Sequence, residues 1–286
     1  MHHDHDLGLQ HDLRLILARR QALRWLGGAG VASLGMGALI GCGGGAGDGD
    51  SLSGSSTDSS GTTTTSTSSS STCSLIPEET AGPYPGDGSN TSNGSIANAL
   101  ALSGIVRSDI RSSIAGATGT ATGVALTVTL NLVNTNASCA SLEGYAVYLW
   151  HCDALGRYSM YSSGVTGENY LRGVQVSDAN GQLMFTTIFP GCYSGRWPHI
   201  HFEVYRSATT ATSFSNKLRT SQLALPESAC DAVYAQSGYT GSASNLSQMS
   251  LSTDNVFSDG SSLQLADVSG SVSSGYAATL EVGISV

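Results

Sequence analysis

The feature that most limits the fold is a regular alternation of apolar and polar side chains. It is clearest from Val124 to Val133, where leucine and valine alternate with threonine and asparagine. Successive side chains of a strand point to opposite faces, so such a segment buries one face only. Similar short segments lie at Tyr145–Trp150, Gly173–Val176, Leu183–Phe189, His199–Arg206 and Leu218–Leu225, and two more within Ser262–Val286.

Clusters of turn-forming residues separate these segments, and signals for helices are nearly absent. Asp178–Gly181 is such a cluster, and it predicts a hairpin between the segments on either side of it. Short strands separated by turn signals at intervals of about ten residues are typical of sandwiches. We therefore predict an all-β domain, an antiparallel β-sandwich, from about residue 75 to residue 286.

The first part of the chain has the composition of a targeting segment. Arg19 and Arg20 precede an apolar, glycine-rich run from Trp25 to Ile40, which predicts a twin-arginine export signal. The run ends in Leu39-Ile-Gly-Cys42, a sequence that resembles a bacterial lipobox. We expect residues 1–42 to be a signal with lipidation at Cys42. The protein would then lie in the cell envelope, facing the periplasm or exterior, with a lipid anchor as its membrane contact.

Residues 43–74 consist largely of glycine, serine and threonine. Such a segment cannot bury enough apolar surface to offset its chain entropy, so we expect a flexible tether. Beyond Cys42 the chain has 12 − 4 = 8 basic and 21 − 3 = 18 acidic residues, a net charge of −10. A chain this acidic, with no basic stripe, is not expected to bind nucleic acid.

Five cysteines follow Cys42, and in an exported protein some of them should form disulfides. An odd number leaves at least one thiol free. The sequence does not determine which cysteines pair, nor how many subunits assemble. The five are Cys73, Cys139, Cys152, Cys192 and Cys230.

The strongest chemical signal is the pair His199 and His201. They are two residues apart in a predicted strand, so both imidazoles leave the sheet on the same face. Tyr193 lies six residues before His199 in a glycine-rich turn, and Tyr158 is a second candidate partner. A phenol gives an anionic ligand at neutral pH only to a strong Lewis acid, because its pKa is about 10. The set suits ferric iron better than magnesium or calcium, which prefer carboxylates.

Several segments together resemble the intradiol ring-cleavage dioxygenases, the catechol and protocatechuate 3,4-dioxygenase family. The resemblance runs from Ile76–Tyr84 through Leu149–Tyr158 and Tyr170–Asp178 to Pro190–Phe202, and more weakly to Leu218–Leu223. It implies a β-sandwich whose loops and one strand hold Fe(III) through Tyr158, Tyr193, His199 and His201. The implied reaction uses O2 to cleave a catechol-type diol between its hydroxyl-bearing carbons, giving a muconate-type diacid.

The resemblance also implies roles for individual residues. Tyr193 would leave the metal and accept a proton from the substrate, and the charge of Arg196 would stabilise the developing carbanion. Gln222 falls where the family has a glutamine near the arginine, and Tyr84 lies in a segment that walls the substrate pocket. The link from Tyr193 to His199 is shorter than in well-known members, so no substrate is transferred from them.

Two alternatives stay open at this point. One is a non-catalytic β-sandwich binding module on a lipid-anchored stalk. The other is an extradiol-type enzyme, in which Glu203 would join the two histidines on ferrous iron. His151 is a third histidine, and we expect it to pack rather than to bind metal.

Overall fold

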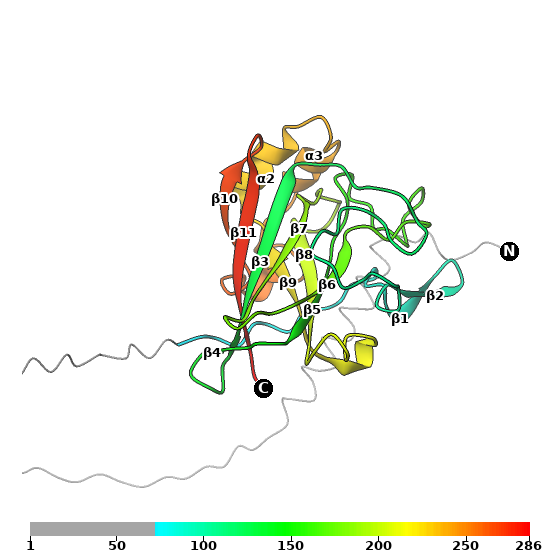
Figure 1. The fold of residues 1–286 in the computed structure, drawn as a ribbon. Coiled ribbons are helices and arrows are strands. Elements are labelled where there is room, and N and C mark those ends of the chain that lie inside the picture. The colour runs from blue at the N-terminus through cyan, green and yellow to red at the C-terminus, as the bar shows by residue number, and fades with distance from the viewer. Residues whose placement is uncertain (1–71) are drawn as a thin grey trace, which may run out of the picture. The chain divides into compact units, whose positions relative to one another are not determined.

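The computed structural model describes residues 72–286 (Figure 1). The predicted export signal, the lipidation site Cys42 and nearly all of the predicted tether lie outside the described residues. Among residues 72–286, no helix is long and apolar enough to cross a membrane.

Two sheets form the sandwich, as predicted (Figure 1). In the first sheet the order is β10-β11-β3-β4, with β7 also paired to β3, and in the second it is β6-β5-β8-β9. The strands of the first sheet are β3 (Ala125–Asn134), β4 (Ala140–Ser141), β7 (Gln182–Ile188), β10 (Asp267–Ser271) and β11 (Gly275–Ile284). Those of the second are β5 (Ala146–Trp150), β6 (Arg172–Val176), β8 (His199–Tyr205) and β9 (Lys217–Ala224). A separate hairpin consists of β1 (Asp87–Ser92) and β2 (Ser95–Asn98).

Three details differ from the sequence-based expectation. The turn at Asp178–Gly181 does not close a hairpin, because β6 pairs with β5 and β7 pairs with β3 in the other sheet. Alternation identifies a strand but not its partner, which explains this error. The sandwich is also not wholly antiparallel, since β11 runs parallel to β3. Two short helices, α2 (Glu227–Tyr234) and α3 (Ser242–Leu246), follow β9 and were not predicted.

Strand β3 shows why the sheets pack face to face. Its inward residues Leu126, Val128, Leu130 and Leu132 are buried, while the residues between them are partly exposed. Burying an apolar side chain of this size contributes about 1.5–3 kcal/mol to stability. The alternation seen in the sequence is therefore the pattern of a sheet with one face in the core.

Strand β8 is different, because all seven of its residues are buried. Ile200, Phe202 and Val204 belong to the core between the sheets. The residues that alternate with these three face the outer side of the second sheet, which is itself covered by other parts of the chain. They are His199, His201, Glu203 and Tyr205. The histidine pair therefore lies on the outer face of the second sheet, beneath other parts of the chain.

The cover includes a crossing segment, residues 75–86. It begins beside β11, where the Ile76 amide donates to the Gly283 carbonyl at 2.8 Å. It then crosses β9, where the Glu79 amide donates to the Thr220 carbonyl at 2.8 Å. At its far end the buried Arg172 side chain donates to the carbonyls of Tyr84, at 3.0 Å, and Pro85, at 2.6 Å.

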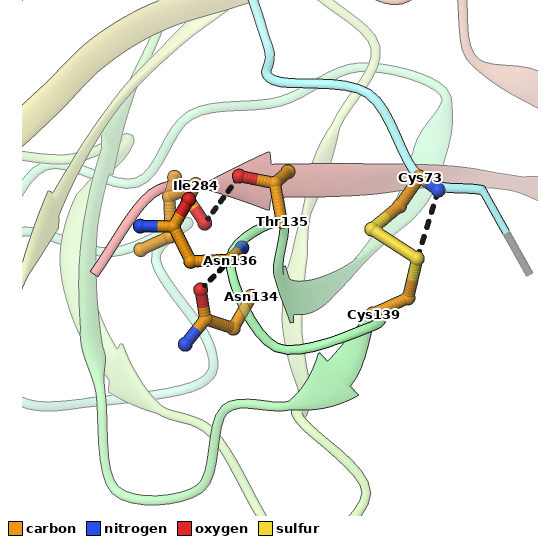
Figure 2. Close-up of a disulfide and its surroundings, with 6 residues drawn as sticks. All are labelled: Cys73, Asn134, Thr135, Asn136, Cys139 and Ile284. Atoms are coloured by element: carbon orange, nitrogen blue, oxygen red, sulfur yellow. Dashed lines mark hydrogen bonds between the residues drawn. A yellow bond between two sulfur atoms is a disulfide. The ribbon is translucent and has the colours of Figure 1, made fainter.

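A disulfide between Cys73 and Cys139 fixes the start of the crossing segment (Figure 2). Cys73 directly precedes this segment, and Cys139 lies in the loop after β3. The same loop contacts Ile284 of β11 (Figure 2). Cys152, Cys192 and Cys230 are free and buried. Strand β7 ends at Ile188, opposite Ala125 at the start of β3, so the chain approaches Tyr193 at the end of the sandwich away from the disulfide.

Removal of this disulfide should destabilise the domain. Its two cysteines are 66 residues apart, so in the unfolded chain it closes a long loop. We expect the double variant Cys73→Ser, Cys139→Ser to lower the free energy of unfolding by about 2–4 kcal/mol. Urea denaturation measures this difference, and reduction of the unmodified protein should reproduce it. An unchanged midpoint in both experiments would contradict the prediction.

Candidate metal centre

The two histidines of β8 meet above the outer face of the second sheet. The Nε2 atoms of His199 and His201 lie 3.1 Å apart. The Nδ1 atom of His199 lies 2.5 Å from the Trp197 carbonyl oxygen, to which it donates as Nδ1–H. This contact fixes the tautomer and leaves the Nε2 lone pair of His199 facing the cluster.

Two loops bring the tyrosines to these histidines. Asp153 organises the loop before Tyr158, accepting hydrogen bonds from the amides of Leu155 at 2.9 Å and Arg157 at 3.0 Å. Gly156 in this loop has a φ of +78°, and a side chain on it would contact the Cβ of Tyr193 at 3.0 Å. Glycine at this position therefore lets the two tyrosine loops pack closely together.

Four donor atoms converge in this way. The Tyr193 hydroxyl lies 3.2 Å from His199 Nε2, and the Tyr158 hydroxyl lies 3.4 Å from the same atom and 3.5 Å from the Tyr193 hydroxyl. A metal ion with bonds of about 2.0–2.1 Å separates neighbouring ligands by roughly 2.9–3.4 Å. The cluster thus has the size of a metal coordination sphere. Among residues 72–286 no group of three or more His, Cys, Asp or Glu side chains could hold a metal, so the phenols are essential to this one.

The surroundings determine the protonation states of the four groups. Burial, and then the nearby Arg196 charge, lowers the pKa of His199 well below its usual value, and burial lowers that of His201 in the same direction. Both imidazoles are therefore neutral at pH 7 and carry lone pairs. Burial raises the pKa of Tyr193 to about 12 and that of Tyr158 well above its ordinary value. Both phenols keep their protons until a strong Lewis acid displaces them, which fits a ferric ion.

His201 is held by packing rather than by a hydrogen bond. Its ring stacks on Trp150 of β5, with 4.9 Å between centroids and 6° between planes. Its Nδ1 atom is buried and has no partner among the described residues. Gly82 of the crossing segment lies against the other edge of the ring, where a Cβ would be 3.4 Å from His201 Cε1. Sequence reasoning identified neither Trp150 nor Gly82.

Arg196, the predicted catalytic arginine, lies beside the cluster, and its main partner was not foreseen from the sequence. Its Nη1 atom lies 3.4 Å from His199 Nε2, and its Nη2 atom donates to Gln222 Oε1 at 2.7 Å. Gln222 in turn donates from Nε2 to the Thr80 carbonyl at 2.9 Å. The Nε atom donates to the buried carboxylate of Asp254 at 2.9 Å. Asp254 belongs to a serine- and threonine-rich loop, with no motif in the sequence to indicate this contact.

Tyr84 lies beside the cluster. Its ring centroid is 4.9 Å from that of Tyr158 and 5.3 Å from that of Tyr161. Tyr84, Tyr161 and Tyr193 are all partly exposed, whereas Tyr158 and the two histidines are buried. The cluster is therefore bordered toward the surface by tyrosine rings.

Two other candidates from the sequence are occupied elsewhere. The Glu203 carboxylate accepts hydrogen bonds from Lys217 Nζ at 2.9 Å and from the Tyr205 hydroxyl at 2.7 Å, so neither oxygen is free to replace the phenols as a metal ligand. His151 contacts the Thr187 hydroxyl at 2.7 Å and the Cys152 carbonyl at 2.8 Å. It packs within the domain, as expected. The extradiol arrangement therefore has no support in this geometry.

Comparison with known proteins agrees with this description. A family model described as "Dioxygenase" matches residues 107–216. The solved structure of an intradiol ring-cleavage dioxygenase from Tetranychus urticae is similar, with a TM-score of 0.56 and 28% sequence identity. The alignment covers 74% of this chain and 95% of that one. The crystal structure of dioxygenase Tetur07g02040 matches with a TM-score of 0.55, 28% identity and the same coverage.

No curated protein matches the chain significantly. The family match includes Tyr158, Tyr193, His199 and His201, whereas Gln222 and Asp254 lie beyond its end. Together, the sandwich, the matched segment and the structural neighbours identify the domain as a member of the intradiol ring-cleavage dioxygenase family.

Proposed function

We propose that this protein is a non-haem Fe(III) dioxygenase that cleaves a catechol-type diol between its hydroxyl-bearing carbons. The observation that carries the proposal is that three donor atoms surround His199 Nε2 at 3.1–3.4 Å. They are His201 Nε2 and the hydroxyls of Tyr158 and Tyr193. Tyr158, Tyr193, His199 and His201 would hold the iron. When bound there, ferric iron would supply a Lewis acid that binds both substrate oxygens and prepares the ring for reaction with O2.

The residues around the cluster would divide the remaining work. Tyr193 is the partly exposed phenol, so it is the one that can move aside and accept a substrate proton. Tyr158 is buried and would remain in place as the permanent anionic ligand. Arg196 directs Nη1 toward the cluster, where its positive charge would stabilise negative charge that develops on the ring.

A non-catalytic binding module explains this arrangement less well. Burying a guanidinium is costly unless it is paired and fully hydrogen-bonded. Arg196, Asp254 and Gln222 are nevertheless all buried beside the four donors. A module that only bound a partner through its surface would have no need of this buried network.

Product analysis tests the proposed reaction. The iron-loaded protein, given catechol and ¹⁸O2, should form a muconate-type diacid that contains both oxygen atoms. The Tyr193→Phe variant should turn over at least about a hundredfold more slowly, because it lacks the mobile phenolate base. Tyr145→Phe is a matched control. Tyr145 directly precedes β5, and its hydroxyl accepts a hydrogen bond from Arg206, which follows the end of β8 opposite His199. Cleavage beside the hydroxyl-bearing carbons, or no ring cleavage, would contradict the proposal.

The pKa values predict how iron binding depends on pH. Both histidines are already neutral at pH 7, whereas Tyr158 and Tyr193, whose pKa values are raised, must each release a proton. Ferric affinity should therefore rise about a hundredfold per pH unit, tenfold for each proton. Competition with ferric citrate between pH 6 and 8 measures this slope, after correction for citrate. Tyr193→Phe should show a tenfold slope, and a flat profile in the unmodified protein would overturn the assignment.

We also propose export by the twin-arginine route and lipid anchoring at Cys42. The disulfide between Cys73 and Cys139 supports an oxidising compartment. In a bacterial host the protein should fractionate with membranes, and Cys42→Ser should release it into the soluble envelope fraction. Replacing Arg19 and Arg20 by lysine should retain the uncleaved precursor in the cytoplasm. A wild-type chain that is exported without lipid would contradict the anchor.

A further inference from the structure

We infer that Asp254 is a positioning residue for the reaction, acting through Arg196. This inference rests on the proposed function of the neighbouring centre. Asp254 is fully buried and comes from a loop after α3, beyond the segment that matches the family model. Its effect on chemistry would follow from how it orients one guanidinium group.

Asp254 binds one edge of that guanidinium. Its Oδ2 atom accepts from Arg196 Nε at 2.9 Å, and its Oδ1 atom lies 3.4 Å from Nη2. Nη2 also donates to Gln222 Oε1 at 2.7 Å. The remaining nitrogen, Nη1, is the one that faces His199 Nε2. Asp254 thus binds Nε and Nη2, and the Gln222 amide also binds Nη2. Only Nη1 is left directed at the four metal-binding side chains.

The same carboxylate fixes the backbone on both sides of this contact. Its Oδ2 atom also accepts from the Trp197 amide at 2.7 Å, two residues before His199. Its Oδ1 atom accepts from the amides of Val256 at 2.8 Å and Phe257 at 3.2 Å, which holds the Asp254 loop itself. Asp254 thus ties the loop after α3 to the turn that carries Arg196.

Charge makes this arrangement specific for aspartate. Arg196 is only 6% exposed, and Asp254 is its carboxylate partner within the described domain. Asparagine has nearly the same shape, but it lacks the charge. Its NH2 group would oppose N–H groups in either orientation, those of Arg196 and Trp197 at the Oδ2 position or those of Val256 and Phe257 at the Oδ1 position. The guanidinium would then lose its fixed direction while the four metal-binding side chains stay intact.

The test compares Asp254→Asn, Arg196→Gln and the double variant in the full-length, iron-loaded protein. Asp254→Asn should lower kcat for catechol about a hundredfold, as expected when one oriented charge is lost, with KM changed less than about threefold. The double variant should be no slower than Arg196→Gln within about twofold, because both changes remove the same interaction. The inference would be overturned if the two losses of kcat multiplied in the double variant, or if kcat were unchanged in Asp254→Asn.

Val256→Ala is the matched control. Val256 is buried in the same loop, and its hydrogen bond to Asp254 comes from the backbone amide, which alanine keeps. This change therefore loosens the packing of the loop and leaves the guanidinium contacts intact. It should lower the melting temperature yet keep kcat within about threefold of the unmodified protein. An equal loss of kcat in Val256→Ala would mean that Asp254 acts only through loop stability.

A measurement on the metal-free protein separates this inference from the proposed function. The Arg196 Nε–H signal in a ¹⁵N NMR spectrum should exchange slowly with water in the unmodified protein and in Val256→Ala, and rapidly in Asp254→Asn. If the iron-loaded protein cleaves no catechol, the proposed function fails, while this signal still decides whether Asp254 orients Arg196. Rapid exchange in the unmodified protein would contradict that orientation.

Discussion

The candidate centre depends on strand β8 being buried on both faces. One face belongs to the core between the sheets, which fixes the position of the strand. The other presents His199 and His201 to a covered space, where burial keeps both imidazoles neutral. An exposed strand with the same two histidines would have mobile and partly protonated side chains. Their burial is therefore what makes the pair a preorganised donor set.

The cover over this face also connects distant parts of the domain. The crossing segment follows closely after Cys73 of the disulfide, contacts β11 and β9, and reaches the cluster at Gly82 and Tyr84. Gln222 on β9 contacts both this segment and Arg196. One continuous set of contacts thus runs from the end of the sandwich that holds Cys73 to the metal-binding side chains. Loosening any part of it should change how the metal-binding side chains are held.

Much of the fold and site could be predicted from the sequence, because both leave local signals. Alternation marked β3, β5, β8 and β9 to within one or two residues, and the two-residue spacing of the histidines placed both on one face. Strand partners could not be predicted in this way, so the turn at Asp178–Gly181 was assigned to a hairpin. Asp254 also escaped prediction, because in the sequence an aspartate in a polar loop looks the same whether or not it binds a buried arginine.

The visible absorption spectrum of the ferric-loaded protein tests the central claim most directly. Phenolate bound to Fe(III) gives a broad charge-transfer band, so the protein should be coloured, and the band should shift when catechol is added under nitrogen. Tyr193→Phe should alter this band. A protein that binds ferric iron but stays colourless, with and without catechol, would show that Tyr158 and Tyr193 are not ligands and would contradict the account.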